Sequence, residues 1–431
     1  MVSGLKRVVV TGMGMVTPLG RSVDENWERL LNGETSIRDV RDTHPYLEDY
    51  DVQIGSMFGE VRGKKIVGFE IDSEKVGISS KDARRMCENT AVAFEAAYEA
   101  IEDSGLDVEK VGRYTGVMVG AGFGGIKMIE ENTEKRLAKG IERVNKLVAP
   151  MAIPGTAAVE IARHNKFRRV VGSGAYACAS GLENPIDGLL RIVTGDAKVM
   201  VCGGTNEISP IIVAGFGNSR ALMKNKDYAP ECSSRPFDKG RGGFVLGDGA
   251  GILVLEELEH AKKRNARIYA EILGYSTTND CFHATASNPN GEWAGEGMRE
   301  ALERAKLNPC DINYINAHGT GTKNDAVESQ VIKNVFGDYT KSIPVNSIKS
   351  MLGHGLNGDG ALKLIDTIKS MNEGWVHPTR NLDNVDFDGG CILEDYVKGC
   401  AKKHKIDYAM VNAFAFGGRN TFMVLGSREI I

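Results

Sequence analysis

The sequence predicts an α/β protein built from two similar halves. The chain has 431 residues, more than most single domains, so it can bury a large core. Short continuous apolar runs, typical of strands covered on both faces, alternate with segments of helical periodicity. The same order of parts occurs in the first half of the chain and again in the second. We therefore expect an internal duplication in which each half is a mostly parallel α/β layer set.

The first half contains four apolar runs that we expect to be strands: residues 6–15, 117–120, 199–204 and 243–255. A helical pattern covers residues 79–104. Ser79 supplies a capping signal at its start, and Gly105 ends it. A second helix is expected directly after Cys178.

The second half repeats this order after a charged helical segment, residues 256–264, which we take as the seam. We therefore divide the chain into an N-terminal half, residues 1–256, and a C-terminal half, residues 257–431. The second half has its own helical pattern over residues 296–305, and another helix follows residues 345–354. Its expected strands are residues 268–274, 314–317, 408–413 and 421–426.

Composition and charge exclude several classes of function. The 53 basic and 57 acidic residues give a net charge of −4, which argues against a nucleic-acid binder acting through bulk charge. The eight cysteines form no C-x-x-C pair, so we expect no disulfide framework, no zinc site and a reducing, cytoplasmic location. The apolar run 8–15 is short and glycine-interrupted, so we expect neither a signal peptide nor a membrane span. The loop 12–17 lacks the third glycine of a dinucleotide fingerprint, which argues against NAD.

Cys178 stands among small residues at the start of a helical pattern. Small neighbours let a substrate approach, and the free N–H groups and positive dipole end of a helix favour the reactive thiolate. A buried structural cysteine is the alternative, and for a random cysteine it is about three times as common as a nucleophile. The residues elsewhere in the chain must therefore decide between the two.

Two histidines, His318 and His354, each precede a glycine in a small-residue loop. In the duplication, the segment 349–354 corresponds in place to Cys178. One cysteine with two separate histidines suits an acyl-thioester enzyme, in which the cysteine carries the acyl group and the imidazoles stabilise a developing oxyanion. A cysteine protease needs only one histidine, and the protease signatures around the cysteine are absent.

Several motifs in fixed order resemble one known family. They include Arg7-Val-Val-Val-Thr-Gly-Met-Gly, Ala177-Cys-Ala-Ser-Gly181, Ser234-Arg-Pro-Phe-Asp-Lys239, Asn316-Ala-His-Gly-Thr-Gly-Thr322, Lys349-Ser-Met-Leu-Gly-His354 and Asn412-Ala-Phe-Ala-Phe-Gly-Gly418. Over essentially its whole length the chain resembles β-ketoacyl-[acyl-carrier-protein] synthases of the synthase II type. The resemblance implies a homodimer with a thiolase-like five-layer αβαβα fold. It also implies decarboxylative Claisen condensation of malonyl-carrier protein with an enzyme-bound acyl chain, in fatty-acid elongation.

The resemblance also implies roles for individual residues. Cys178 would be acylated, and His318 and His354 would hold the malonyl thioester oxygen during decarboxylation. Lys349 would lie near the histidines and pair with Glu328. The N–H groups of Cys178 and Phe416 would form the oxyanion hole, while the residues expected to contact the substrate are Thr285, Thr320, Thr322, Phe414 and Phe123. Apart from the phosphopantetheine of the acyl carrier protein, no cofactor is implied.

The partner and the pocket follow from the same resemblance. Acyl carrier proteins are acidic, so we expect docking on a local basic patch, Lys81, Arg84 and Arg85 with Arg143 and Lys146; an ordinary solvated face is the alternative. Phe123 would reach across the dimer interface into the acyl pocket, where the family commonly has a smaller residue. Filling core between the subunits is its alternative role.

Several positions differ from the family pattern. They are Tyr176, Pro185, Gly242, Asn357, Asp359, Ala415 and Arg419. We expect Pro185 to kink the nucleophile helix or displace a hydrogen bond, and Ala415 to stiffen the gating loop. We expect none of these differences to touch Cys178, His318, His354 or Lys349, so that they affect the acyl substrate rather than the reaction class.

Two other functions remain open at this point. The chain could be the ketosynthase of a specialised polyketide or polyene pathway, with the same reactive residues and a different acyl chain. It could also be a non-catalytic partner subunit of a synthase, but such partners typically lack the nucleophile, and Cys178 is present.

Overall fold

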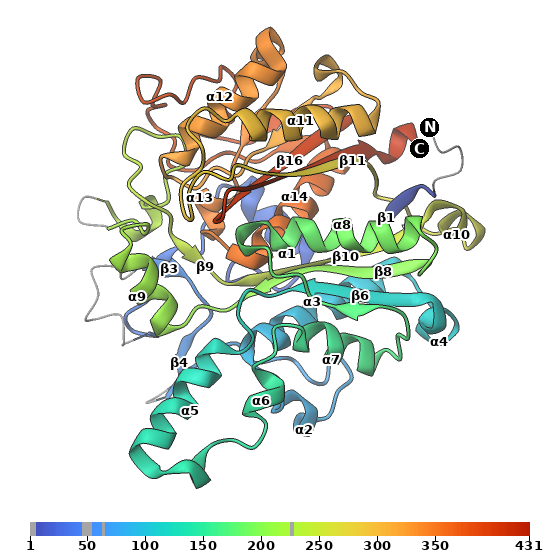
Figure 1. Cartoon of the computed structure of the whole chain (residues 1–431), viewed down its shortest axis with the longest axis vertical. Coiled ribbons are helices and arrows are strands. Elements are labelled where there is room, and N and C mark those ends of the chain that lie inside the picture. Colours follow the sequence, from blue (N-terminus) through green and yellow to red (C-terminus); the bar gives the residue numbers. More distant parts are fainter. Residues whose placement is uncertain (1–5, 45–53, 63–64, 225–227) are drawn as a thin grey trace.

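A ten-stranded mixed sheet runs through the molecule (Figure 1). The computed structural model describes residues 6–44, 54–62, 65–224 and 228–431. In spatial order the strands are β13 (Val345–Asn346), β12 (Tyr314–Asn316), β16 (Tyr408–Ala415), β17 (Arg419–Ser427), β11 (Ala270–Asn279), β1 (Val8–Val16), β10 (Gly249–Glu257), β8 (Val199–Asn206), β6 (Thr115–Gly120) and β7 (Val171–Gly172).

The strand order confirms the predicted duplication. From the centre of the sheet outward, the first half runs β1, β10, β8, β6, β7, and the second half runs β11, β17, β16, β12, β13. If the five sheet strands of each half are numbered along the chain, both halves have the same spatial order from the centre outward: first, fifth, fourth, second and third. The halves meet where Val9 pairs with Glu271 and Val10 with Ala270, antiparallel. The boundary after residue 256 itself stays a prediction.

The expectation of mostly parallel halves was wrong. In the first half, β6 is parallel to β7 and β8, but β10 is antiparallel to both β8 and β1. The second half has the same arrangement. A continuous apolar run indicates that both faces of a strand are buried, but it does not indicate the direction of the strand. Here helices cover antiparallel strands as well as parallel ones.

Helices cover the sheet in a five-layer αβαβα stack, as the resemblance implies (Figure 1). The middle layer is α8 (Ser180–Val193) and α14 (Asp359–Glu373), which contact each other between the two halves of the sheet. The outer layers are α3 (Glu88–Ser104) with α7 (Thr156–His164), and α11 (Glu292–Ala305) with α12 (Asn324–Phe336). Because α8 and α14 begin at the same end of this layer, the segments that precede them meet there.

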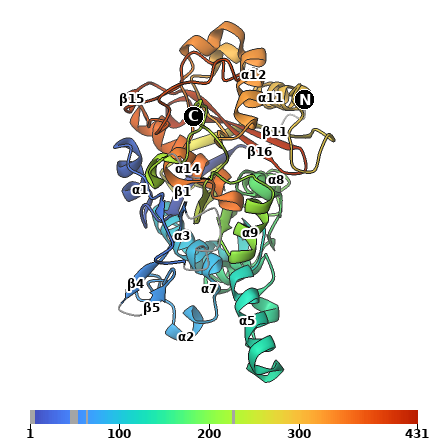
Figure 2. The same cartoon turned by 90° about the vertical axis from the view of Figure 1, so that its left-hand side faces the viewer.

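Shorter elements surround the layers. The helices are α1 (Val23–Leu31), α2 (Ser80–Ala83), α4 (Val108–Val111), α5 (Ile126–Lys139), α6 (Val148–Met151), α9 (Pro210–Asn218), α10 (Leu258–Lys263) and α13 (Lys349–Leu352). The strands are β2 (Arg38–Asp39), β3 (Ile54–Ser56), β4 (Glu60–Arg62), β5 (Lys65–Val67), β9 (Leu246–Gly247), β14 (Trp375–Val376) and β15 (Lys402–Lys403). Figure 2 shows α5 extending away from the layers. No helix within the described ranges is long and apolar enough to cross a membrane.

The helix expected over residues 79–104 is two helices. The Ser79 side chain caps only the short α2, and α3 starts afresh at Glu88. The N-terminus of α3 is capped by tertiary contact, because the Glu207 carboxylate accepts the N–H of Asn89 at 3.0 Å. A local capping pattern could not reveal a cap that comes from another part of the chain. Gly105 ends α3 in the left-handed conformation, as predicted.

Candidate active site

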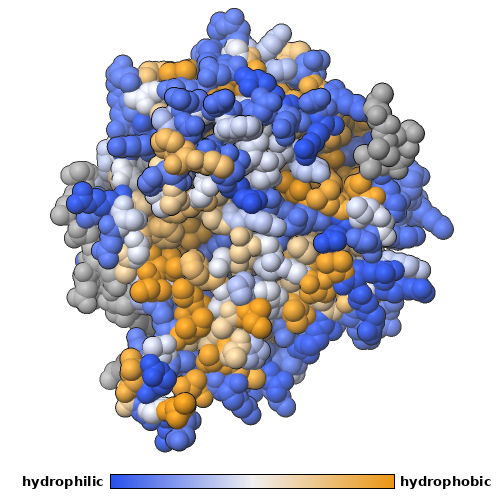
Figure 3. Space-filling model, in the orientation of Figure 1, coloured by the Kyte–Doolittle hydropathy of each residue, from blue (hydrophilic) through white to orange (hydrophobic). Residues whose placement is uncertain are grey.

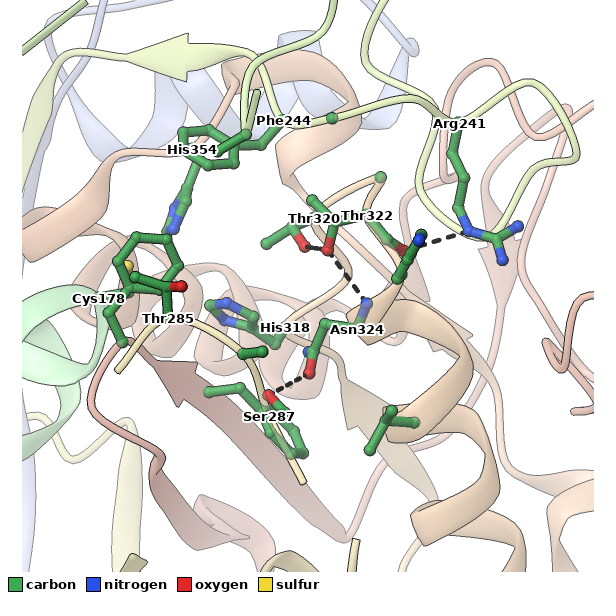
Figure 4. Close-up of a pocket in the computed structure, with 18 of the residues that line it drawn as sticks. Cys178, Arg241, Phe244, Thr285, Ser287, His318, Thr320, Thr322, Asn324 and His354 are labelled. Atoms are coloured by element: carbon green, nitrogen blue, oxygen red, sulfur yellow. Dashed lines mark hydrogen bonds between the residues drawn. The ribbon is translucent and has the colours of Figure 1, made fainter. Parts of the chain in front are cut away.

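Cys178 lies in a single 3-10 turn, η4 (Ala177–Ala179), directly before α8. The predicted position at a helix N-terminus is therefore confirmed. Ala177 has φ +48°, a conformation that costs a residue with a Cβ about 1–3 kcal/mol and that is typical of functional sites. The half-buried thiol lines a cavity of about 840 Å³ that residues of both halves enclose (Figure 4).

The second half has a matching turn, η8 (Leu356–Gly358), directly before α14. Its first residue, Leu356, also has positive φ, at +40°. The structural counterpart of Cys178 is thus Asn357, and not the segment 349–354 as we expected. The Asn357 side-chain amide donates to the Ala177 carbonyl at 2.9 Å and to Ser180 Oγ at 3.0 Å, so it ties the two turns together.

His318 follows β12 in a loop that one carboxylate holds. Glu328 Oε1 accepts the N–H of His318 at 2.7 Å, and Oε2 accepts the N–H of Gly319 at 2.9 Å. Gly319 has φ +34°, and a Cβ there would lie 2.7 Å from that of Ser347, so the loop requires glycine. The result is a fixed backbone beneath a buried imidazole.

His354 is anchored to the opposite wall through its backbone. Its N–H donates to the Val245 carbonyl at 2.6 Å, and its carbonyl accepts from the N–H of Gly247 at 3.0 Å. The imidazole packs edge-on against Phe244, with ring centroids 5.3 Å apart. It also stands nearly perpendicular to His318, at 87° with centroids 5.4 Å apart. The glycine after His354 has φ −75°, so it has no conformational need to be glycine.

Burial and neighbouring charges shift the pKa values of the two imidazoles in opposite directions. Burial, with Lys349 and Lys363 nearby, lowers the pKa of His318 well below its ordinary value. Burial alone would lower the pKa of His354 too, but contact with Cys178 and with the Asp359 carboxylate raises it. The site therefore holds a neutral imidazole beside one that favours the proton, a split typical of catalytic acid–base pairs.

Lys349 is buried beside the histidines as predicted, but its predicted partner was wrong. Its ammonium donates to the His318 carbonyl at 2.5 Å and lies 2.8 Å from Asp359 Oδ2. Glu328 is instead occupied by the two loop N–H groups and by the Asn412 amide at 3.0 Å. Asp359 also lies 3.7 Å from the His354 ring. The expectation that no family difference touches these groups was therefore wrong.

Four site residues were missed: Asp325, Asp359, Lys363 and Asn412. Asp325 accepts the N–H groups of Thr320 and Gly321, at 2.9 and 3.0 Å, and so shapes the threonine loop. Asp325 and Asp359 are both acids in the first turn of a helix, a signal that was available in the sequence. Asn412 stands in the motif 412–418, but its contact with Glu328 arises only in the packed fold, and Lys363 gave no signal in the sequence.

The structure brings most of the predicted substrate residues into the same cavity. Thr285, Thr320, Thr322, Phe414 and Phe416 line it together with Cys178, His318 and His354 (Figure 4). The hydroxyls of Thr320 and Thr322 are 2.9 Å apart, and the Phe414 ring lies 6.1 Å from the His318 ring, centroid to centroid.

The remaining predicted residues lie elsewhere on the chain. Phe123 is not among the residues that line this cavity, and its side chain is 43% exposed. The predicted docking residues are all exposed, on or beside α2 and after α5: Lys81, Arg84, Arg85, Arg143 and Lys146. Their roles stay predictions.

Two of the family differences contact each other. The Arg419 guanidinium lies over the Tyr176 ring, 4.7 Å from its centroid, and bonds the Glu183 carboxylate at 2.9 Å. The Tyr176 hydroxyl donates to Asp187 Oδ2 at 3.0 Å. This contact connects the turn before Cys178, which Tyr176 precedes, to β17, where Arg419 stands. α8 continues from Ser180 to Val193 through Pro185.

Comparisons with known proteins identify the family of the chain. The chain is similar to the models "Beta-ketoacyl synthase, N-terminal domain" over residues 5–261 and "Beta-ketoacyl synthase, C-terminal domain" over residues 269–383. It is 40% identical over 427 residues to 3-oxoacyl-[acyl-carrier-protein] synthase 2 of Staphylococcus aureus (strain COL), covering 98% of this chain and 99% of that protein.

Two solved structures share the fold over 98% of this chain and 100% of theirs. One is a beta-ketoacyl synthase from Burkholderia phymatum STM815, with TM-score 0.88 and 34% identity. The other is a ketosynthase in complex with its type II PKS acyl-carrier protein and bound to the hexaketide, with TM-score 0.86 and 28% identity. The two family models together match residues 5–261 and 269–383, and the relative matches the chain over nearly its full length. The chain belongs to the β-ketoacyl synthase family.

Proposed function

We propose that this chain is a 3-oxoacyl-[acyl-carrier-protein] synthase that condenses malonyl-carrier protein with an acyl chain held on Cys178. The observation that carries the proposal is the meeting of Cys178 from the first half with His318 and His354 from the second around one cavity. Neither half alone has this set, so the duplication itself builds the site. The reaction is an acyl transfer, which makes the chain an acyltransferase.

In the first step Cys178 takes the acyl group. The Cys178 thiol loses its proton, and the thiolate attacks the thioester carbonyl of the acyl-carrier protein. A new carbon–sulfur bond forms, the pantetheine thiolate leaves, and this thiolate takes up the proton that Cys178 lost. The N–H groups of Cys178 and Phe416 receive the oxyanion of the tetrahedral intermediate. The helix N-terminus behind Cys178 favours the thiolate that attacks.

In the second step a carbon–carbon bond forms. The malonyl carboxylate leaves as carbon dioxide, and its bonding electrons produce an enolate whose oxygen accepts hydrogen bonds from His318 and His354. The enolate carbon attacks the acyl carbonyl, and the Cys178 thiolate leaves. Lys349 holds the His318 loop through the His318 carbonyl and adds positive charge near the enolate.

We infer that the substrates arrive on the phosphopantetheine arm of an acyl carrier protein, with no other cofactor. Thr320, Thr322 and Thr285 all line the cavity, where their hydroxyls can bind the arm. The family relative whose structure contains an acyl-carrier protein supports this partner. Exposed Lys81, Arg84 and Arg85, with Arg143 and Lys146, provide the basic patch for an acidic carrier.

We further infer a homodimer. β7 is the last strand of the sheet, no strand among the described residues pairs with its outer edge, and Val171 on it is 36% exposed. Other large apolar side chains are exposed on the neighbouring elements: Phe123, Ile129, Ile153, Val159 and Leu190. Figure 3 shows hydrophobic side chains gathered over this region. A second copy would cover both the strand edge and the apolar side chains. A cytoplasmic location and no role in nucleic-acid or membrane binding stay predictions.

A second candidate is a ketosynthase of a polyketide or polyene pathway. The contact between Tyr176 and Arg419 beside the nucleophile turn supports considering it, since both residues differ from the usual family pattern and can change the acyl substrate. A non-catalytic partner subunit is disfavoured, because Cys178, His318, His354 and Lys349 are all present.

Mass spectrometry of Cys178 tests these alternatives. The protein is incubated with acyl-carrier proteins that bear saturated, polyene or 3-oxo chains of graded length, and malonyl-carrier protein is then added. Acyl adducts on Cys178 that are consumed with formation of a 3-oxo product support the synthase, and the chain type acylated fastest identifies the pathway class. No adduct on Cys178 with any carrier would overturn the proposal.

A further inference from the structure

Asp359, the first residue of α14, is an acidic side chain that the condensation steps above do not use. It is only 1% exposed. Oδ2 lies 2.8 Å from Lys349 Nζ and 3.7 Å from Lys363 Nζ, and Oδ1 lies 3.7 Å from His354 Nδ1. A carboxylate this deeply buried persists only when neighbouring charges compensate it. Asp359 is therefore the centre of a buried charge cluster that includes a catalytic histidine.

The charged and titratable groups near Asp359 come from several elements. Lys349 belongs to α13 and Lys363 to α14, while His354 follows α13. The Lys349 ammonium bridges Asp359 to the His318 carbonyl, and Glu328 of α12 holds the other side of the His318 loop. Cys178 approaches His354 from the first half. The carboxylate thus connects both histidines, one directly and one through Lys349.

Asn357 connects the charge cluster to the turn that carries Cys178 through hydrogen bonds. Two residues before Asp359, its amide holds the Ala177 carbonyl and Ser180 Oγ on either side of Cys178. The start of α14 is therefore fixed against the start of α8. The carboxylate and the thiol, which both interact with His354, are thus carried by two turns that are bonded to each other.

The charge states in the cluster agree with this geometry. Burial would raise the pKa of Asp359, but Lys349 and Lys363 hold it well below its ordinary value, so the group is an anion. Burial and the nearby Lys349 lower the pKa of Lys363 to about 7, despite Asp359. Lys363 thus faces the same carboxylate as Lys349 and His354, and Asp359 partly offsets the cost of burying its charge.

We propose that Asp359 is a positioning residue for acylation: its carboxylate fixes Lys349 against the His318 loop and stabilises the imidazolium that forms when His354 takes the thiol proton of Cys178. This inference rests on the proposed function. In the step, the S–H bond of Cys178 breaks and an N–H bond forms on the His354 ring, giving a thiolate and an imidazolium. Lys363 lies 3.7 Å from Asp359 Oδ2, the same oxygen that Lys349 approaches, so the two ammonium groups share the charge of this carboxylate.

Titration of His354 by NMR tests the proposal without relying on turnover. The protein is labelled with ¹³C at histidine Cε1, and the His354 signal is assigned by its loss in His354→Ala. We expect Asp359→Asn to lower the titration midpoint of His354 by about one pH unit or more, because an opposite charge at this distance has been removed. We expect Lys363→Met to raise the midpoint, because Asp359 then has one ammonium fewer to compensate its charge and acts more strongly on His354. Opposite shifts cannot come from general loosening of the site.

Kinetics and a conservative variant complete the test. Asp359→Asn should lower kcat for condensation at least about tenfold with little change in KM for the acyl carrier, and Asp359→Glu should recover part of both kcat and the midpoint. Equal midpoints in wild type, Asp359→Asn and Lys363→Met, or shifts in the same direction, would overturn the inference. If Asp359→Asn does not fold, the direction of the Lys363→Met shift decides. Absence of condensation by the wild type would refute the proposed function, while the titration would still measure the coupling.

Discussion

The His318 and His354 rings stand edge to face, with centroids 5.4 Å apart and planes 87° apart, each held by a different wall of the cavity. His318 rests on the Glu328 carboxylate through its backbone, whereas His354 is bonded into the Val245–Gly247 segment. Two donors that converge from independent supports are preorganised for a charge that forms between them. The enolate of the malonyl step is such a charge, so the two half-reactions should be separable by mutation.

The first prediction concerns this separation. Cys178→Gln should abolish condensation but leave decarboxylation of malonyl-carrier protein unchanged or faster, because the histidines that stabilise the enolate remain. His318→Ala or His354→Ala should slow decarboxylation about 10²- to 10³-fold, the effect of losing one oxyanion donor. Release of ¹⁴C-labelled carbon dioxide measures one half-reaction, and 3-oxoacyl product measures the other.

The matched control is Cys391→Ser, which changes another buried cysteine that lies outside the cavity. It should leave both half-reactions intact. Condensation by Cys178→Gln, or decarboxylation unaffected by both histidine variants, would show that the roles are assigned wrongly.

The sequence predicted those features of the fold that depend on residues close together in the chain. The strands, the turn before the nucleophile helix and the duplication follow from apolar runs, glycine positions and the repeated order. The break between α2 and α3 was missed because Glu207, far along the chain, caps α3. Strand direction was missed because cover on both faces gives the same apolar run in parallel and antiparallel pairs.

In the site, the sequence identified the reacting residues but not their ion pairs. Cys178, His318, His354 and Lys349 come together as expected, yet Lys349 pairs with Asp359 and not with Glu328. The chain has many carboxylates, and which one reaches a buried ammonium depends on the packing of α13 against α14. Family resemblance misled here, because Asp359 is one of the positions where this chain departs from the pattern.

A second prediction concerns docking of the carrier protein. Replacing both Arg84 and Arg85 with Glu should raise KM for acyl-carrier protein steeply at low salt and less at high salt. The cause is that exposed charges are screened beyond about 8 Å at physiological ionic strength. Steady-state kinetics over a range of salt concentrations makes the measurement. Lys262→Glu with Lys263→Glu, an exposed pair on α10, is the control and should have little effect. An unchanged KM at low salt would remove this patch from the docking surface.

A third prediction concerns the crossing of the two central helices. A Cβ on Gly360 of α14 would lie 2.4 Å from the backbone nitrogen of Leu182 on α8, and backbone atoms cannot move aside as a side chain can. Gly360→Ala should therefore lower the free energy of unfolding by about 1–3 kcal/mol, typical of overpacking.

Gly215 in α9 provides the control, because a Cβ there would meet nothing within 4 Å. Gly215→Ala should be neutral or stabilise by up to about 1 kcal/mol, since alanine favours a helix over glycine. Thermal and denaturant unfolding of both variants gives the comparison. Equal stability of the two would mean that the helices can separate at this point at little cost.

The last prediction concerns acyl chain length and Phe123, which stands in the turn between β6 and α5. Its ring is 43% exposed in the single chain, and its carbonyl accepts from the Asn89 amide at 2.9 Å, so the backbone is fixed while the ring is available to a second copy. If the ring enters the partner's acyl pocket, a long acyl chain must displace it, and overfilling a packed site costs about 1–3 kcal/mol. Phe123→Ala should then shift acylation of Cys178 toward longer chains and leave malonyl decarboxylation nearly unchanged. Phe387→Ala, which removes another exposed ring, should keep the wild-type profile. An identical length profile for wild type and Phe123→Ala would place Phe123 outside the pocket.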